Sequence, residues 1–87
     1  MSYSKDLLDE IFSKGEPIPN EDPKLYRKDK FGNEIHRYDY GKQTTYGWEV
    51  DHSKPQSIGG TGHLNNLQPL QWEENRSKSD NYPYSKN

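Results

Sequence analysis

The order of short elements between residues 47 and 79 constrains this chain more than any other feature of its sequence. Residues 48–52 alternate as a strand does, with Trp48 and Val50 turned toward a core and Glu49 and Asp51 toward the opposite face. A proline ends this stretch, and a loop with three glycines follows it. The sequence therefore predicts a half-buried strand that leads into a flexible loop.

The loop leads into a second strand and a helix. Residues 66–70 predict a short strand in which Leu67 and Leu70 contact the core, and Pro69 places it at an edge or makes it irregular. Residues 71–79 predict a short helix with acidic residues in its first turn and Lys78 in its last, which matches the helix macrodipole. Strand, loop, strand and helix are thus expected in this order.

The chain before residue 47 predicts one helix and one ribbon. Residues 4–14 carry an apolar stripe of helical spacing, with Ser4 as the N-cap and Gly15 as the C-cap. Residues 16–23 hold three prolines and are expected to form an extended loop.

A tight turn at residues 30–33 is flanked by two short runs, 25–28 and 34–38, that predict a two-stranded ribbon. Residues 38–47 are polar and rich in tyrosine, and we expect them to wrap the core without a regular element.

The length predicts one domain over residues 1–87, near the size at which a single core is only just sufficient, and the expected helices and strands make it α+β. No cysteine is present, so neither a disulfide nor a thiolate zinc site is available to stabilise it. Eleven aromatic residues stand beside eleven leucine, isoleucine and valine residues. Aromatic packing should therefore form much of the core, with Trp48 and Trp72 inside it.

The net charge of −2 argues weakly against a protein that coats nucleic acid. Residues 1–22, the acidic helix and proline-rich loop, have six acidic and two basic residues, whereas residues 23–87 have ten basic and eight acidic residues. A surface that faces DNA should therefore lie in the second segment. Residues 1–12 are charged and lack an apolar run, so we expect neither a signal peptide nor a membrane span. We therefore expect the protein to be cytoplasmic.

A set of polar residues marks the strand, loop, strand and helix stretch. Asp51 and His52 end the first strand, Pro-x-Ser and Gly-Gly follow, Asn66 precedes a leucine, and an Asn-x-x-Lys sequence runs from Asn75 to Lys78. Over residues 47–80 this pattern resembles an HNH endonuclease of the ββα-metal (His-Me finger) class, in an HNN variant. Many members carry two Cys-x-x-Cys pairs that bind structural zinc, so the resemblance implies the branch without structural zinc.

The resemblance implies a metal-dependent endonuclease that hydrolyses DNA phosphodiester bonds and leaves 5′-phosphate and 3′-hydroxyl ends. Asp51 and Asn75 offer hard oxygen ligands for one Mg²⁺ or Mn²⁺. His52 would be the general base, since a histidine side chain titrates near pH ~6.5 in model peptides and can accept a proton from water. Because the protein offers only two ligands, one of them neutral, we expect the metal and a DNA phosphate to bind cooperatively.

By the same resemblance, Asn66 does not touch the metal but braces the loop and helps to fix His52, with Asn65 as the alternative for this position. The expected phosphate contacts are Lys54, Arg76 and Lys78.

Two other residues and two other functions stay open. Glu49 is either an ion-pair partner or an acid that supports the site, and His63 is either a loop residue or a substrate contact. The chain could instead be a catalytically silent nucleic-acid-binding module. It could also be a toxin or effector nuclease domain whose acidic helix binds an inhibitory partner. We expect a monomer with little readout of base sequence.

Overall fold

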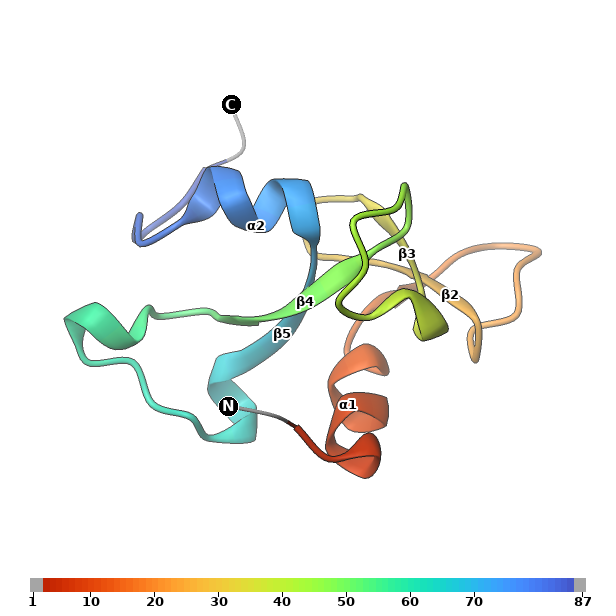
Figure 1. The fold of residues 1–87 in the computed structure, drawn as a ribbon. Helices are drawn as coiled ribbons and strands as arrows, with labels where there is room; N and C mark the ends of the chain where they lie inside the picture. Colours follow the sequence, from red (N-terminus) through yellow and green to blue (C-terminus); the bar gives the residue numbers. More distant parts are fainter. Residues whose placement is uncertain (1–2, 86–87) are drawn as a thin grey trace.

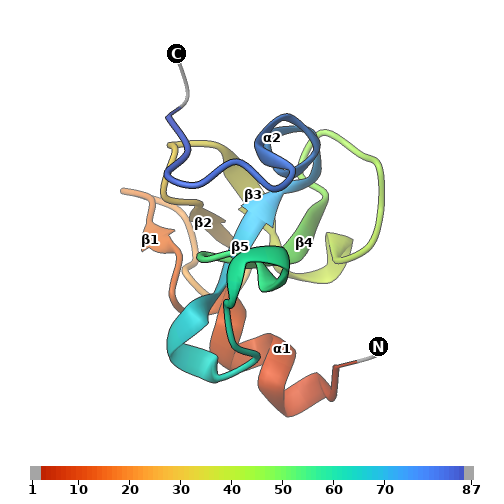
Figure 2. The same ribbon diagram turned by 90° about the vertical axis from the view of Figure 1, so that its left-hand side faces the viewer.

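The hairpin formed by β4 (Trp48–His52) and β5 (Leu67–Gln71) lies at the centre of the computed structural model, which describes residues 3–85 (Figure 1). Helix α2 (Trp72–Lys78) follows β5 directly, so strand, loop, strand and helix occur in the predicted order. Helices α1 (Lys5–Phe12) and α2 lie on opposite sides of the hairpin (Figure 2). The described chain is an α+β fold with two helices and two small antiparallel sheets.

The register of the hairpin fixes which side chains share a face. Asp51 lies opposite Gln68, and His52 lies opposite Leu67. Cross-strand partners in an antiparallel pair point to the same face, and neighbouring residues point to opposite faces. Asp51 and Gln68 therefore share one face, and His52 and Leu67 share the other.

Helix α1 packs its apolar stripe on the hairpin. A backbone N–H of the first turn donates to Ser4 Oγ over 3.1 Å, so Ser4 is the N-cap as predicted. Ile11 and Phe12 are buried at the end of the helix. The helix ends earlier than expected, because the backbone N–H of Ser13 closes its last turn. Gly15 is instead buried beside β2, where an added Cβ would lie 2.9 Å from the Cβ of Arg27.

The second sheet has three strands where two were predicted. Strands β2 (Tyr26–Lys28) and β3 (Glu34–His36) form the expected ribbon, and Gly32 in its turn has a φ of +88°. Strand β1 (Glu16–Pro17) pairs with β2, so the prediction of an extended loop over residues 16–23 was wrong for its first two residues. Pro17 is tolerated there because β1 is an edge strand.

The core is aromatic at its centre, as the composition predicts. Trp48 is 1% exposed, and its ring lies 5.6 Å from the ring of Phe12 and 5.1 Å from that of Tyr40, measured between centroids. The buried cluster also contains Ile11, Ile35 and Leu67. Trp72 was expected in the core but is only half-buried, and its indole Nε1 donates to the Thr44 carbonyl over 2.8 Å. A half-buried indole with a polar partner belongs at the edge of a core.

Residues 38 and 39 belong to a short 3-10 helix, η1 (Arg37–Asp39), so the expectation of no regular element was wrong there. Residues 40–47 cross the edge of the hairpin without a helix or strand, and Tyr40 forms a single bridge to Trp48. Neither α1 nor α2, the α-helices within residues 3–85, has the length and apolar character that crossing a membrane requires.

Candidate metal and nucleic-acid site

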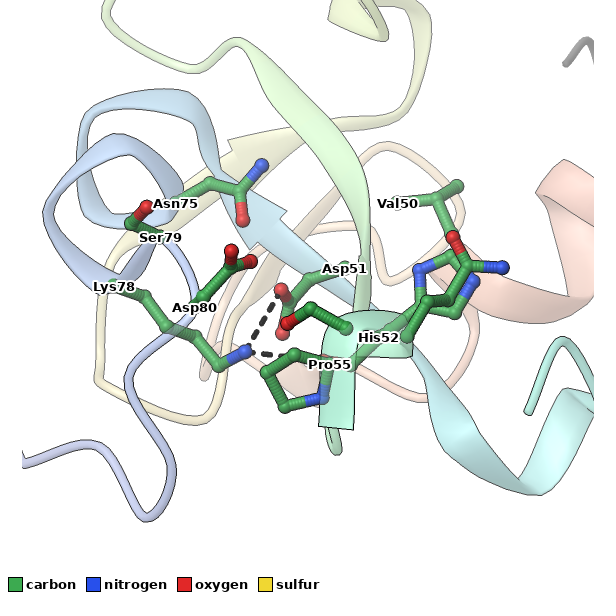
Figure 3. Close-up of a pocket in the computed structure, with 10 residues that line it drawn as sticks. Val50, Asp51, His52, Pro55, Asn75, Lys78, Ser79 and Asp80 are labelled. Carbon is green, nitrogen blue, oxygen red and sulfur yellow. Dashed lines mark hydrogen bonds and ion pairs between the residues drawn. The ribbon is translucent and has the colours of Figure 1, made fainter. Parts of the chain in front are cut away.

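A polar cleft of about 340 Å³ opens between the end of β4 and the end of α2 (Figure 3). Its walls come from β4, from the loop after β4 and from the last turn of α2 with the two residues that follow it. The polar side chains in this lining include Asp51, His52, Asn75, Lys78 and Asp80. Three of the four predicted catalytic and metal-binding residues therefore reach one cleft, and Asn66 is the exception.

Asp51 is the buried acid of the cleft, with 6% of its surface exposed. Its Oδ1 accepts a hydrogen bond from Lys78 Nζ at 3.1 Å, and its Oδ2 accepts one from Gln68 Nε2 at 2.7 Å. Gln68 is in place because it is the direct cross-strand neighbour of Asp51. Both carboxylate oxygens are thus engaged within the protein.

Lys78 lies inside the structure, although the sequence suggested a phosphate contact. It is 2% exposed, and its Nζ also donates to the His52 carbonyl at 3.0 Å. Residues three apart on a helix share a face, so Lys78 stands on the same side of α2 as Asn75. That side packs on β4, which directs the ammonium to Asp51 rather than to solvent.

Asn75 is oriented by Glu49. Its Nδ2 donates to Glu49 Oε1 over 2.7 Å, which turns the amide oxygen toward Asp51, as Figure 3 shows. The other carboxylate oxygen of Glu49 pairs with the Arg76 guanidinium at 3.1 Å. Glu49 therefore fills both of the roles left open by the sequence, since it is an ion-pair partner and it also supports a residue of the cleft.

Asn66 braces the loop between β4 and β5. Its Oδ1 accepts from the Lys54 backbone N–H at 2.9 Å, and its Nδ2 donates to the Lys54 carbonyl at 3.1 Å and the Thr61 carbonyl at 2.6 Å. Its own carbonyl accepts from the Ser53 N–H at 2.8 Å. This is the bracing that the resemblance assigns to Asn66, whereas Asn65 is exposed.

A second constraint on the same loop is the lack of a side chain at Gly60. An added Cβ would lie 1.7 Å from the Lys54 carbonyl oxygen, so only glycine fits. The loop that starts beside His52 is therefore held both by Asn66 and by a close approach of its own backbone.

His52 lines the cleft, but its side chain projects from the other face of β4. It is half-buried, and Figure 3 shows its imidazole set apart from the cluster of Asp51, Asn75 and Lys78. The strand alternation explains this separation, because successive side chains point to opposite faces. The imidazole of the candidate base and the candidate metal ligands therefore lie on opposite sides of β4.

The remaining predicted contacts differ in how far they reach solvent. Lys54 is exposed at the start of the loop, and the Arg76 side chain is 57% exposed, although it pairs with Glu49 and lies over the Trp72 ring at 5.8 Å. His63 is exposed on the loop and does not line the cleft.

One acid of the cleft was missed from the sequence. Asp80 follows the end of α2, and Figure 3 shows its carboxylate beside Asn75 and Asp51. Only its spacing of two residues from Lys78 could have drawn attention to it.

The donor set of the cleft fits a hard divalent cation. The Asp51 carboxylate and the Asn75 amide oxygen are ligands of the kind that Mg²⁺ and Mn²⁺ prefer, and Asp51 already accepts one cationic group. Within residues 3–85, no three or more His, Cys, Asp or Glu side chains are grouped so that they could hold a metal ion. Comparison with protein-family models, curated proteins and solved structures finds no match for this chain, so its function has to be argued from this cleft.

Proposed function

We propose that this chain is a metal-dependent endonuclease of the HNH type, which hydrolyses DNA phosphodiester bonds in the cleft between β4 and α2. One observation carries the proposal: Asp51 from β4 and Asn75 from α2 present oxygen atoms to the same polar cleft that His52 lines. The order of β4, loop, β5 and α2 supports assigning the ββα-metal motif to residues 47–80.

Asp51 and Asn75 would hold one Mg²⁺ or Mn²⁺, with Glu49 keeping the Asn75 amide oxygen directed into the cleft. A bound divalent ion supplies positive charge that stabilises the phosphorane-like transition state of hydrolysis and the departing oxygen. Orientation by Glu49 matters because a rotated asparagine would present its NH₂ group, which cannot be a ligand.

His52 would act as the general base and take a proton from the attacking water. Because His52 and Asp51 project from opposite faces of β4, the scissile phosphate would have to lie beyond the end of the strand, where both side chains could reach it. Asn66 would keep the loop that follows His52 in one conformation through its bonds to Lys54 and Thr61.

Binding of DNA would rest on phosphate contacts from two exposed basic side chains near the cleft, Lys54 and Arg76. Phosphate contacts carry no sequence information, so little base readout and a steep loss of activity with salt are expected.

Nicking of supercoiled plasmid tests the proposal. The wild-type protein should nick with Mg²⁺ or Mn²⁺ and stop when EDTA is added. His52→Ala should lower the rate by at least about 10²-fold, as expected for a lost general base. The matched control is His63→Ala, an exposed histidine outside the cleft lining, which should keep its activity.

If the wild type nicks with neither metal, the proposed endonuclease activity is refuted. DNA binding without nicking would favour the silent binding module. An equal loss in His63→Ala would remove the case for His52 as the base.

A further inference from the structure

The buried ammonium of Lys78 occupies the cation position of the cleft. Lys78 Nζ lies 3.1 Å from Asp51 Oδ1, and the two side chains are 3% and 6% exposed. We propose that Lys78 is a built-in counter-ion of Asp51 that competes with the divalent metal, so that metal binds only as this ion pair opens. The proposal rests on the proposed function in one respect, that a divalent ion binds at Asp51.

Competition follows from how the two oxygens of Asp51 are used. Oδ2 is held by Gln68 on the strand side, which leaves Oδ1 as the oxygen that faces α2, and Lys78 takes that oxygen. A Mg²⁺ ion binds an oxygen ligand at about 2.0–2.1 Å. Two cations on one oxygen repel each other, and salt screens that repulsion little because the pair is buried.

The position of Lys78 in the fold lets the pair open. Lys78 is the last residue of α2, and the next two residues are exposed. Within residues 3–85 its ammonium has one other hydrogen-bond partner, the neutral His52 carbonyl. A lysine has a flexible four-carbon stem, so its ammonium can move without a shift of the helix axis. A displaced ammonium at the rim of the cleft would meet an incoming phosphate, which gives a physical source for cooperative binding of metal and DNA.

Nuclear magnetic resonance of the wild-type protein, with lysines labelled by ¹³C and ¹⁵N, observes the pair directly. Addition of Mg²⁺ should shift the ε-methylene and ammonium signals of Lys78 with the same midpoint as metal binding measured by calorimetry. Lys14 is the internal reference, because its ammonium donates to the Leu67 carbonyl over 2.6 Å and not to a residue of the cleft lining. Its signals should not follow the metal.

Calorimetry of Lys78→Met gives the second measurement. Loss of the competing charge should tighten Mg²⁺ binding by about tenfold or more. The control is Lys24→Met, which removes the same charge from an exposed site in the loop before β2 and should leave the dissociation constant unchanged. If Lys78→Met fails to fold, the wild-type titration still decides the question.

The outcomes separate the two proposals. If the wild type binds metal and the Lys78 signals do not move, the competition is overturned while the metal site stands. The same holds if Lys78→Met binds metal no more tightly than the wild type does. Binding by Lys78→Met where the wild type binds nothing measurable would support it strongly. If neither protein binds Mg²⁺ or Mn²⁺, the metal site itself falls, and the competition falls with it.

Discussion

The two faces of the β4–β5 hairpin pack against helices in opposite ways. The face toward α1 buries Trp48 and Leu67 against Phe12, with aromatic and aliphatic side chains on both sides. The face toward α2 buries an acid and a base, Asp51 and Lys78, in direct contact. The hairpin, whose strands are five residues long, thus carries an apolar interface on one face and an ionic interface on the other.

The two faces should contribute differently to stability. Burial of apolar surface stabilises a fold by about 25 cal/mol per Å², whereas a buried ion pair returns little after its desolvation penalty. The α1 side should therefore supply most of the free energy of folding. The α2 side keeps charged groups where apolar ones would stabilise at least as well, and the metal site proposed there would account for them.

The two tryptophans test this division with the largest expected effect. Trp48→Ala should lower the free energy of unfolding by about 3–5 kcal/mol, the usual loss for a fully buried aromatic residue. Trp72→Ala, on the α2 side and half-buried, should lose about 1–2 kcal/mol. Urea unfolding followed by circular dichroism measures both, and equal losses would show that the α2 side is as important for stability as the α1 side.

A substitution at Glu49 should show the opposite pattern, with a large effect on function and a small one on stability. Glu49→Ala frees the Asn75 amide and should weaken metal binding and cleavage about 10–100-fold, as loss of a supporting hydrogen bond to a ligand does. Its pair with Arg76 is partly exposed, so the loss of stability should stay below about 1 kcal/mol.

Glu73→Ala is the matched control for Glu49→Ala. Glu73 is an exposed acid in the first turn of α2 that does not line the cleft. Both variants remove one carboxylate, so calorimetry and nicking should separate them if orientation of Asn75 matters. A loss of metal affinity as great in Glu73→Ala would mean that net charge, not orientation, sets the affinity.

The sequence predicted those parts of the fold that depend on neighbours along the chain. The strand over residues 48–52, the Ser4 cap and the turn at Gly32 are local features, and each is present. Burial does not alternate along that strand as predicted, because Asp51 is buried and Val50 only partly so. The bracing by Asn66 was expected from the resemblance to HNH endonucleases, and the hydrogen bonds to Lys54 and Thr61 agree with it.

Features that depend on which faces meet could not be predicted in this way. The buried position of Lys78 arises because one side of α2 docks on β4, and residue spacing alone does not reveal that choice. Trp72 stands at the edge for the same reason. The pairing of β1 with β2 joins a proline-rich segment to the next strand along the chain, and local propensity favours a loop there.

Tyr84 gives a smaller test on the α2 side. Its hydroxyl donates to Glu74 Oε2 over 2.5 Å, and its ring packs on Phe31 with centroids 5.2 Å apart. The hydrogen bond to Glu74, then burial, raises the pKa of Tyr84 above its ordinary value of 10.0. On the α1 side, burial raises the pKa of Tyr40 above the same value, with Tyr3 and Glu49 adding to the shift.

The sign of the pH effect is the same for both tyrosines. A phenol whose pKa is raised by folding binds its proton more tightly in the folded chain, so its contribution to stability is full below about pH 10 and is lost as the pH rises through the folded pKa. Urea unfolding from about pH 8 to 11 should therefore show a declining free energy of unfolding in the wild type. Tyr40→Phe and Tyr84→Phe should each make that decline shallower. Burial of Tyr40 against the core does not depend on the α2 side, so Tyr40→Phe should make the decline shallower in the Lys78→Met background as well. If it does not, the two faces of the hairpin do not act independently.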